Sequence, residues 1–141
     1  MIVVDTSFVY ALLDRRDARH REAAVWYEGT TEEVATTPLV LAEVDHLART
    51  RAGVVAGAAF RSDVRAGAYM VEWWPAAARL AAEIADRYTD QGVSLTDASL
   101  VALAERLGTR RIATFDERHF RLMQPLQPGV AAFTLVPLDA G

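Results

Sequence analysis

Short apolar runs alternate with longer stretches of helical periodicity along this chain. Each run is rich in branched or aromatic residues and is too short for a helix, so each predicts a strand. The runs are IVVD (2–5), VATTP (34–38), YMVEWWP (69–75), RRIATFD (110–116) and FTLVP (133–137).

The stretches between these runs carry apolar residues at three- and four-residue spacing, which predicts helices. The predicted helices cover residues 6–13, about 16–28, 39–51, 54–67, 76–92 and 94–108. Glycines stand inside or after several of them, as is common where a helix is interrupted or ends. Strands separated by helices are typical of a parallel sheet joined by right-handed crossovers. The pattern therefore predicts an α/β fold of three layers, α/β/α, with a parallel sheet of about four to five strands.

Two of the predicted strands end in an aspartate, Asp5 after IVV and Asp116 after RIATF. The carboxyl ends of parallel strands lie on one edge of a sheet, where α/β proteins place their ligand sites. The two aspartates can therefore meet if their strands are neighbours. An alternative for the first is that Asp5 or Thr6 caps the helix that follows.

Two further acids interrupt apolar helix faces: Glu43 in LVLAEVDHL and Asp97 in LTDASLVALAERL. Each has a structural alternative. Asp97 could stabilise a helix start through the helix dipole, and Glu43 could pair with an arginine such as Arg51.

The four acids Asp5, Glu43, Asp97 and Asp116 would repel one another in a single cleft unless a divalent cation neutralised them. Carboxylate oxygens without cysteine favour Mg²⁺ or Mn²⁺ over zinc. Such an ion lowers the pKa of a bound water, which can then attack a phosphodiester. This is the chemistry of a nuclease.

The composition bounds the fold and excludes several functions. A chain of 141 residues with 52% hydrophobic content is predicted to form one domain, residues 1–141. Without cysteine it has no disulfide, thiolate metal site or cysteine nucleophile. No apolar stretch reaches the roughly 20 residues that span a bilayer, and Met1 leads directly into a strand. We therefore expect a cytoplasmic location and no membrane partner.

The basic residues are all arginine, and they cluster although the net charge is −4. One cluster follows the first predicted helix, one closes another helix and one brackets a late segment; their members are Arg15, Arg16, Arg19 and Arg21, then Arg49 and Arg51, and then Arg110, Arg111, Arg118 and Arg121. Arginine clusters can bind phosphates bidentately, although each one taken alone is equally consistent with a solvated surface.

The ordered set VVDTS, LAEVDHL, LTDASLVALA and ATFDERHF resembles a PIN domain, specifically a VapC-type toxin ribonuclease of a type II toxin-antitoxin system. The resemblance covers essentially the whole chain. It implies a Mg²⁺- or Mn²⁺-dependent endoribonuclease in which Asp5, Glu43, Asp97 and Asp116 hold the metal. The expected substrate is a structured RNA of the tRNA or rRNA class. The resemblance also implies a VapB-type antitoxin partner and a homodimer.

Several residues around the four acids are candidates for supporting roles. The resemblance implies that Thr6 or Ser7 and Thr114 orient the pocket by hydrogen bonding. His119 could contact phosphate or donate a proton, but a structural role beside the acids is favoured because metal-water chemistry needs no histidine base. Asp90 could assist from outside the pocket, although a solvated helix face explains it more simply.

Two other functions compete with the nuclease. The chain could be a catalytically weak PIN-like module acting mainly in an antitoxin or repressor complex, which an activity assay on partner-free protein would distinguish. A haloacid-dehalogenase-like phosphatase needs an aspartate two residues after its nucleophile, and Ser7 occupies that place.

Overall fold

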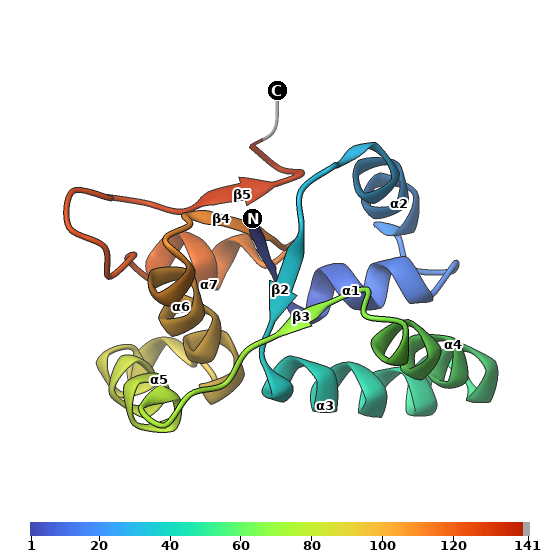
Figure 1. The fold of residues 1–141 in the computed structure, drawn as a ribbon, viewed down its shortest axis with the longest axis horizontal. Coiled ribbons are helices and arrows are strands. Elements are labelled where there is room, and N and C mark those ends of the chain that lie inside the picture. Colours follow the sequence, from blue (N-terminus) through green and yellow to red (C-terminus); the bar gives the residue numbers. More distant parts are fainter. Residues whose placement is uncertain (140–141) are drawn as a thin grey trace.

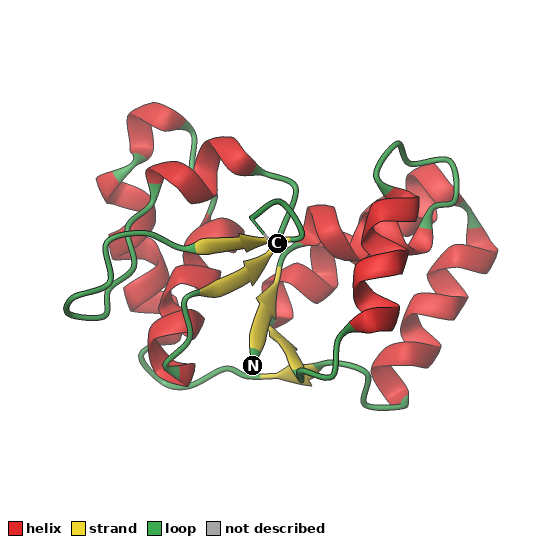
Figure 2. Ribbon diagram, turned by 90° about the horizontal axis from the view of Figure 1, so that it is seen from above, coloured by secondary structure: helices red, strands yellow, loops and turns green. Residues whose placement is uncertain are grey.

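The computed structural model describes residues 1–139, and its centre is a parallel sheet of five short strands. The strands are β1 (Ile2–Val4), β2 (Val34–Thr36), β3 (Met70–Val71), β4 (Arg111–Ala113) and β5 (Thr134–Val136). Their order across the sheet is β3-β2-β1-β4-β5, and every neighbouring pair is parallel. Helices flank the sheet on both sides (Figure 2). This confirms the predicted three-layer α/β/α fold.

Within residues 1–139, seven α-helices connect and cover the strands (Figure 1). They are α1 (Thr6–Leu13), α2 (His20–Gly29), α3 (Pro38–Leu47), α4 (Val54–Arg65), α5 (Ala77–Arg87), α6 (Leu95–Leu107) and α7 (Glu117–Leu122). A π-helical turn, η1 (Ala48–Ala52), extends α3, and a 3₁₀ turn, η2 (Thr89–Gln91), follows α5. None of the helices in residues 1–139 combines the length and apolarity that crossing a membrane requires.

Several element boundaries differ from the sequence prediction. The second helix begins at His20 rather than near Arg16, because the side chains of Asp14 and Asp17 accept backbone N–H bonds two residues on and hold turns there. The third strand pairs over Met70–Val71 alone. The helix α7 was not predicted, since it has six residues and no full apolar period.

The central strand β1 is buried on both faces and anchors the fold. Ile2, Val3 and Val4 are at most 1% exposed. The helix α6 packs against β1 and α5, and all seven residues from 98 to 104 are buried. A helix that is apolar all round needs partners on several sides, which explains why this one lies between the sheet and α5.

The strands that end in aspartate are neighbours, as the nuclease interpretation requires. Val4 of β1 is in register with Ala113 of β4. The backbone N–H of Asp5 donates to the carbonyl of Ala113 over 3.1 Å. The ladder thus continues to the carboxyl edge of the sheet, where it places Asp5 beside Thr114.

The turn between η1 and α4 generates a stability prediction. Gly53 has φ 103° and ψ 177°, a conformation that side chains rarely adopt. Gly53→Ala should therefore lower the free energy of unfolding by about 1–3 kcal/mol. The matched control is Gly29→Ala at the end of α2, where an added Cβ meets open space and φ is not positive. Urea unfolding that showed equal effects for both variants would contradict this account.

Candidate metal centre

Asp5 is the most buried acid of the site, and both of its carboxylate oxygens accept hydrogen bonds. It is 3% exposed. Its Oδ1 accepts the Ser7 hydroxyl at 2.8 Å and the Phe8 backbone N–H at 3.1 Å, and its Oδ2 accepts the Thr114 hydroxyl at 2.7 Å. Asp5 is therefore the N-cap of α1, as the alternative proposed, and it also lies at the carboxyl edge of the sheet. The cap uses one oxygen and does not exclude a second role.

Burial raises the pKa of Asp5 to about 7. Desolvation is the largest cause; the hydrogen bonds from Thr114, Ser7 and Phe8 oppose it, and the charge of Asp97 raises the pKa further. Capping alone does not explain a carboxylate in this position, because an exposed cap costs no such desolvation. A bound cation would favour the ionised form again.

Two hydroxyl groups tie the ends of β1 and β4 together around Asp5. The Ser7 hydroxyl oxygen accepts the backbone N–H of Phe115 at 3.0 Å. The Thr114 hydroxyl oxygen accepts the backbone N–H of Asp116 at 2.9 Å. Each hydroxyl donates to Asp5 and accepts from the backbone after β4, so the network links Asp5 to the segment that carries Asp116. Thr6 takes no part, since its buried hydroxyl has no hydrogen-bond partner within residues 1–139.

Asp116 and Asp97 both lie in or beside the first turn of a helix. Asp116 is the N-cap of α7, where its Oδ1 accepts the backbone N–H of His119 at 3.1 Å. Asp97 lies in the first turn of α6, and its backbone N–H donates to the N-cap Ser94 at 3.0 Å. Their side chains are 30% and 18% exposed, so both carboxylates border solvent.

Asp97 is electrostatically coupled to the other three acids. Burial is the main reason that its pKa is raised, and the charge of Asp116 is next. Glu43 pushes the pKa of Asp97 in the same direction, whereas His119 lowers it. Asp97 in turn raises the pKa of Asp5. The repulsion that the sequence analysis anticipated is therefore present in this structure.

Glu43 approaches the group from α3 and is the most exposed of the four acids. Within residues 1–139 no arginine lies at ion-pair distance from its carboxylate, Arg51 included. Its charge instead acts on Asp97. The structural alternative for Glu43 has no support in these contacts.

His119 joins the two acids at the helix starts. Its Nδ1 lies 3.0 Å from Asp116 Oδ2 and 3.3 Å from Asp97 Oδ2. One atom from each of the three side chains lies within 4.8 Å of the others, a spacing that could hold a metal ion. The Nε2 of His119 lies 3.2 Å from the carbonyl oxygen of Gln91, a residue that the sequence analysis did not single out.

Asp90 precedes Gln91 in η2 and is exposed. No hydrogen bond joins its carboxylate to the four acids within the described chain. The Gln91 carbonyl is a main-chain group, so no side-chain pattern in the sequence could have indicated its contact with His119.

Half of the ten arginines in the clusters form surface ion pairs. Arg16, Arg19, Arg49, Arg111 and Arg121 each contact a carboxylate within 3.5 Å. No ion pair is present within residues 1–139 for Arg15, Arg21, Arg51, Arg110 and Arg118. The second group is the one available for phosphate contacts.

Comparison with known proteins relates the chain to one family. The PIN domain model matches residues 2–124. Ribonuclease VapC26 of Mycobacterium tuberculosis is 34% identical over 137 residues, which are 96% of this chain and 100% of that protein. The crystal structure of M. tuberculosis VapC20, a sarcin-ricin loop cleaving toxin, superposes with a TM-score of 0.76 at 30% identity, covering 82% of this chain and 90% of that one.

A more distant structure shares the fold alone. FitAcB from Neisseria gonorrhoeae has a TM-score of 0.63 at 19% identity and covers 95% of this chain and 97% of that chain. Its match over nearly the full length shows that the order of strands and helices is common to both proteins.

The raised pKa of Asp5 generates a prediction for the protein in chelator. Because the folded-state pKa of about 7 exceeds the unfolded value of about 3.9, the folded state binds more protons between these values. The free energy of unfolding should therefore fall by a few kcal/mol, on the order of 1.4 per pKa unit, as pH rises from about 4 to 7.

Asp5→Asn should flatten this pH dependence, leaving the smaller slope that Asp97 contributes in the same direction. Its amide can still accept from Ser7 and Phe8, and the Thr114 hydroxyl can rotate to accept from the new NH₂. Denaturant titrations across this pH range check the expectation, with the exposed Asp86→Asn as control. If the free energy of unfolding of the parent and of Asp5→Asn changed equally with pH, folding would not raise the pKa of Asp5, and the prediction would be wrong.

Proposed function

This chain belongs to the PIN domain family, and from that premise we propose that it is a metal-dependent endoribonuclease toxin of a VapBC-type pair. The observation that carries the proposal is the position of Asp5. Its desolvated carboxylate lies at the sheet edge beside a solvent-bordered group of acids that repel one another. Such an arrangement is costly unless a cation compensates it.

The donor set fits a hard divalent cation. Asp5, Glu43, Asp97 and Asp116 supply carboxylate oxygens. Helix capping uses only one oxygen of Asp5 and one of Asp116, and Ser94 rather than Asp97 caps α6. Carboxylates with remaining water ligands are what Mg²⁺ and Mn²⁺ accept. When bound, the cation supplies charge stabilisation for the phosphodiester and lowers the pKa of an attacking water.

The protein residues would each have a defined part in hydrolysis. Hydrogen bonds from Ser7 and Thr114 hold the Asp5 carboxylate in one orientation, so it is already positioned to bind the ion. Asp97 and Asp116 border solvent and can face the scissile phosphate. Glu43, which is exposed and free of arginine partners among the ion pairs of residues 1–139, is placed to orient a water or accept its proton.

The substrate we propose is a ribosomal RNA hairpin of the sarcin–ricin type. The support is the similarity to VapC20, whose structure is described as a toxin that cleaves this loop. Single-stranded loop nucleotides are also the part of a folded RNA that proteins read most readily. A cytoplasmic location and a single domain over residues 1–141 follow as part of the same proposal.

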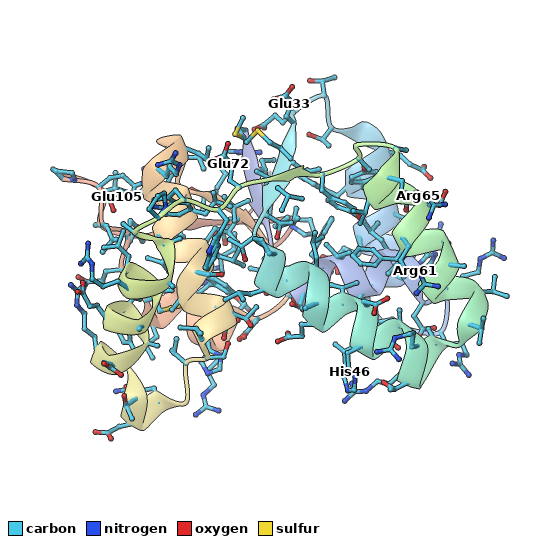
Figure 3. All side chains as sticks on the ribbon, turned by 60° about the horizontal axis from the view of Figure 1, so that its bottom comes forward. Glu33, His46, Arg61, Arg65, Glu72 and Glu105 are labelled. Carbon is cyan, nitrogen blue, oxygen red and sulfur yellow. The ribbon has the colours of Figure 1, made fainter. Side chains whose placement is uncertain are left out.

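We also propose a VapB-type antitoxin as partner and a homodimer as the assembled form. An apolar groove of about 410 Å³ between α3 and α4 supports a peptide partner. Leu41, Phe60 and Val64 line it, and the side chains of Arg61 and Arg65 project from the adjoining α4 (Figure 3). Its apolar floor suits a hydrophobic segment of a partner.

Cleavage of a synthetic sarcin–ricin hairpin by partner-free protein tests the proposal. Asp5→Asn and Asp97→Asn should each lower the rate constant more than about 100-fold in Mn²⁺ or Mg²⁺, because each removes one of few charges that bind the ion. Asp86→Asn on the exposed side of α5 should cleave at the parent rate. A folded parent that binds the hairpin and leaves it intact would favour the alternative of a catalytically weak binding module.

RNA affinity should depend on the arginines without ion pairs. With Asp97→Asn as a non-cleaving background, log Kd should rise linearly with log salt. Adding Arg118→Ala, beside the N-cap of α7, should reduce the magnitude of that slope by about 1. Arg79→Ala, whose guanidinium pairs with Glu83 on α5, should leave the slope unchanged. Filter-binding titrations with an unchanged slope for Arg118→Ala would remove this residue from the RNA interface.

A further inference from the structure

The contacts of His119 place an acceptor at each ring nitrogen. The Nε2 lies 3.2 Å from the main-chain carbonyl of Gln91, and the Nδ1 lies 3.0 and 3.3 Å from carboxylate oxygens of Asp116 and Asp97. A carbonyl and an ionised carboxylate accept hydrogen bonds and donate none. A neutral imidazole has one N–H, so it can satisfy only one of its two sides here.

The Gln91 carbonyl and the two carboxylates compete for the single N–H of a neutral ring. The carbonyl can only accept, so its contact with Nε2 is a hydrogen bond when Nε2 carries the hydrogen, and a metal ion on Nδ1 selects that tautomer. The Nδ1 lone pair of the neutral ring then points at two carboxylates. The Nδ1 lone pair and the two carboxylate oxygens, Asp97 Oδ2 and Asp116 Oδ2, repel one another unless a cation lies between them. That cation is either a second proton on Nδ1 or a metal ion.

The spacing of the three groups suits a metal ion. The candidate ligand atoms of Asp97, Asp116 and His119 all lie within 4.8 Å of one another. Ligands at roughly 2.1 Å from an octahedral ion are separated by about 3 Å when adjacent and about 4.2 Å when opposite. A ring that donates its other N–H to a main-chain carbonyl is also the usual setting of a metal-bound histidine, because that bond fixes the tautomer and the ring orientation.

We infer that His119 is a nitrogen ligand of the metal ion, together with Asp97 and Asp116, and that this mixed ligand set makes the protein bind Mn²⁺ in preference to Mg²⁺. The inference rests on the proposed metal-dependent function and specifies which ion the site takes. Mg²⁺ strongly prefers oxygen ligands, whereas Mn²⁺ accepts imidazole nitrogen more readily.

Local structure explains how a short sequence presents both ligand types. Asp116 and His119 are three residues apart, which puts them on one side of the first turn of α7. Asp116 uses Oδ1 to cap that turn and keeps Oδ2 toward His119 Nδ1. The turn η2 then reaches the opposite side of the ring with Gln91. The contacts with Asp116 and with the Gln91 carbonyl therefore restrict the orientation of the His119 ring before any ion binds.

Pulsed electron paramagnetic resonance of the Mn²⁺-loaded, partner-free protein tests the inference directly. A directly bound imidazole nitrogen couples to the Mn²⁺ electron spin, and oxygen ligands give no such coupling. We expect nitrogen coupling in the parent, and we expect it to change from the ¹⁴N to the ¹⁵N pattern when histidine alone is ¹⁵N-labelled. This measurement needs no substitution and so does not depend on the folding of a variant.

Two variants assign the coupling to one ring. His119→Gln should lose it, and its Mn²⁺ dissociation constant by calorimetry should rise about 10-fold or more, while that for Mg²⁺ changes little. His46→Gln is the matched control, because His46 is exposed on α3 (Figure 3) and lies one turn from Glu43. It should keep both the coupling and the affinity. Circular dichroism in chelator verifies the fold of each variant.

The outcomes separate this inference from the proposed function. Tight Mn²⁺ binding by the parent without histidine coupling would overturn the inference and assign the cation at Nδ1 to a proton, leaving the metal-dependent nuclease intact. A parent that binds neither Mn²⁺ nor Mg²⁺ in calorimetry would overturn both. Equal affinity for the two ions in the parent would also count against the imidazole as the selective ligand.

Discussion

The site depends on keeping a carboxylate at position 5 buried where β1 and β4 end. Desolvation raises the pKa of Asp5 to about 7, and three hydrogen bonds offset that cost only in part. Two of the three donors, the hydroxyls of Ser7 and Thr114, also accept the backbone N–H groups of Phe115 and Asp116, and so join the ends of the two strands. The strand pairing, the helix cap and the proposed ion-binding group are therefore stabilised by one network, and a change at Asp5 reaches all three.

Helix starts converge on this edge and reduce the repulsion among the acids. Asp5 caps α1, Asp116 caps α7, and Asp97 occupies the first turn of α6. The amino end of a helix carries a partial positive charge and free N–H groups, so an acid is favourable there. Capping and metal binding need not compete, because Asp116 uses one carboxylate oxygen for the backbone and directs the other to His119. The capping role of Asp5 is thus compatible with the metal-binding role that we propose for it.

The surface charges complement this acidic edge in a limited way. Many of the arginines form ion pairs with carboxylates. Arg49 and Arg61, for example, both pair with Asp45. Such exposed pairs contribute little to stability, but they remove those guanidinium groups from a simple count of phosphate-binding residues. Affinity for RNA in a chain of net charge −4 would then come from the arginines without such pairs and from the ion at the edge.

The sequence by itself determined the alternation of strands and helices and the fold class, and it singled out the four acids that we propose as metal ligands. These follow from local periodicity and from apolar runs that end in aspartate, such as IVVD and RIATFD. It did not determine that β1 and β4 are neighbours, that Asp97 is coupled to Glu43, or that His119 lies between two carboxylates and the Gln91 carbonyl. Nor did it indicate α7 or which arginines are paired. Strand order, pairs of charges and main-chain contacts join residues far apart in the chain, so the energies that select them arise only when the sheet and its helices pack together.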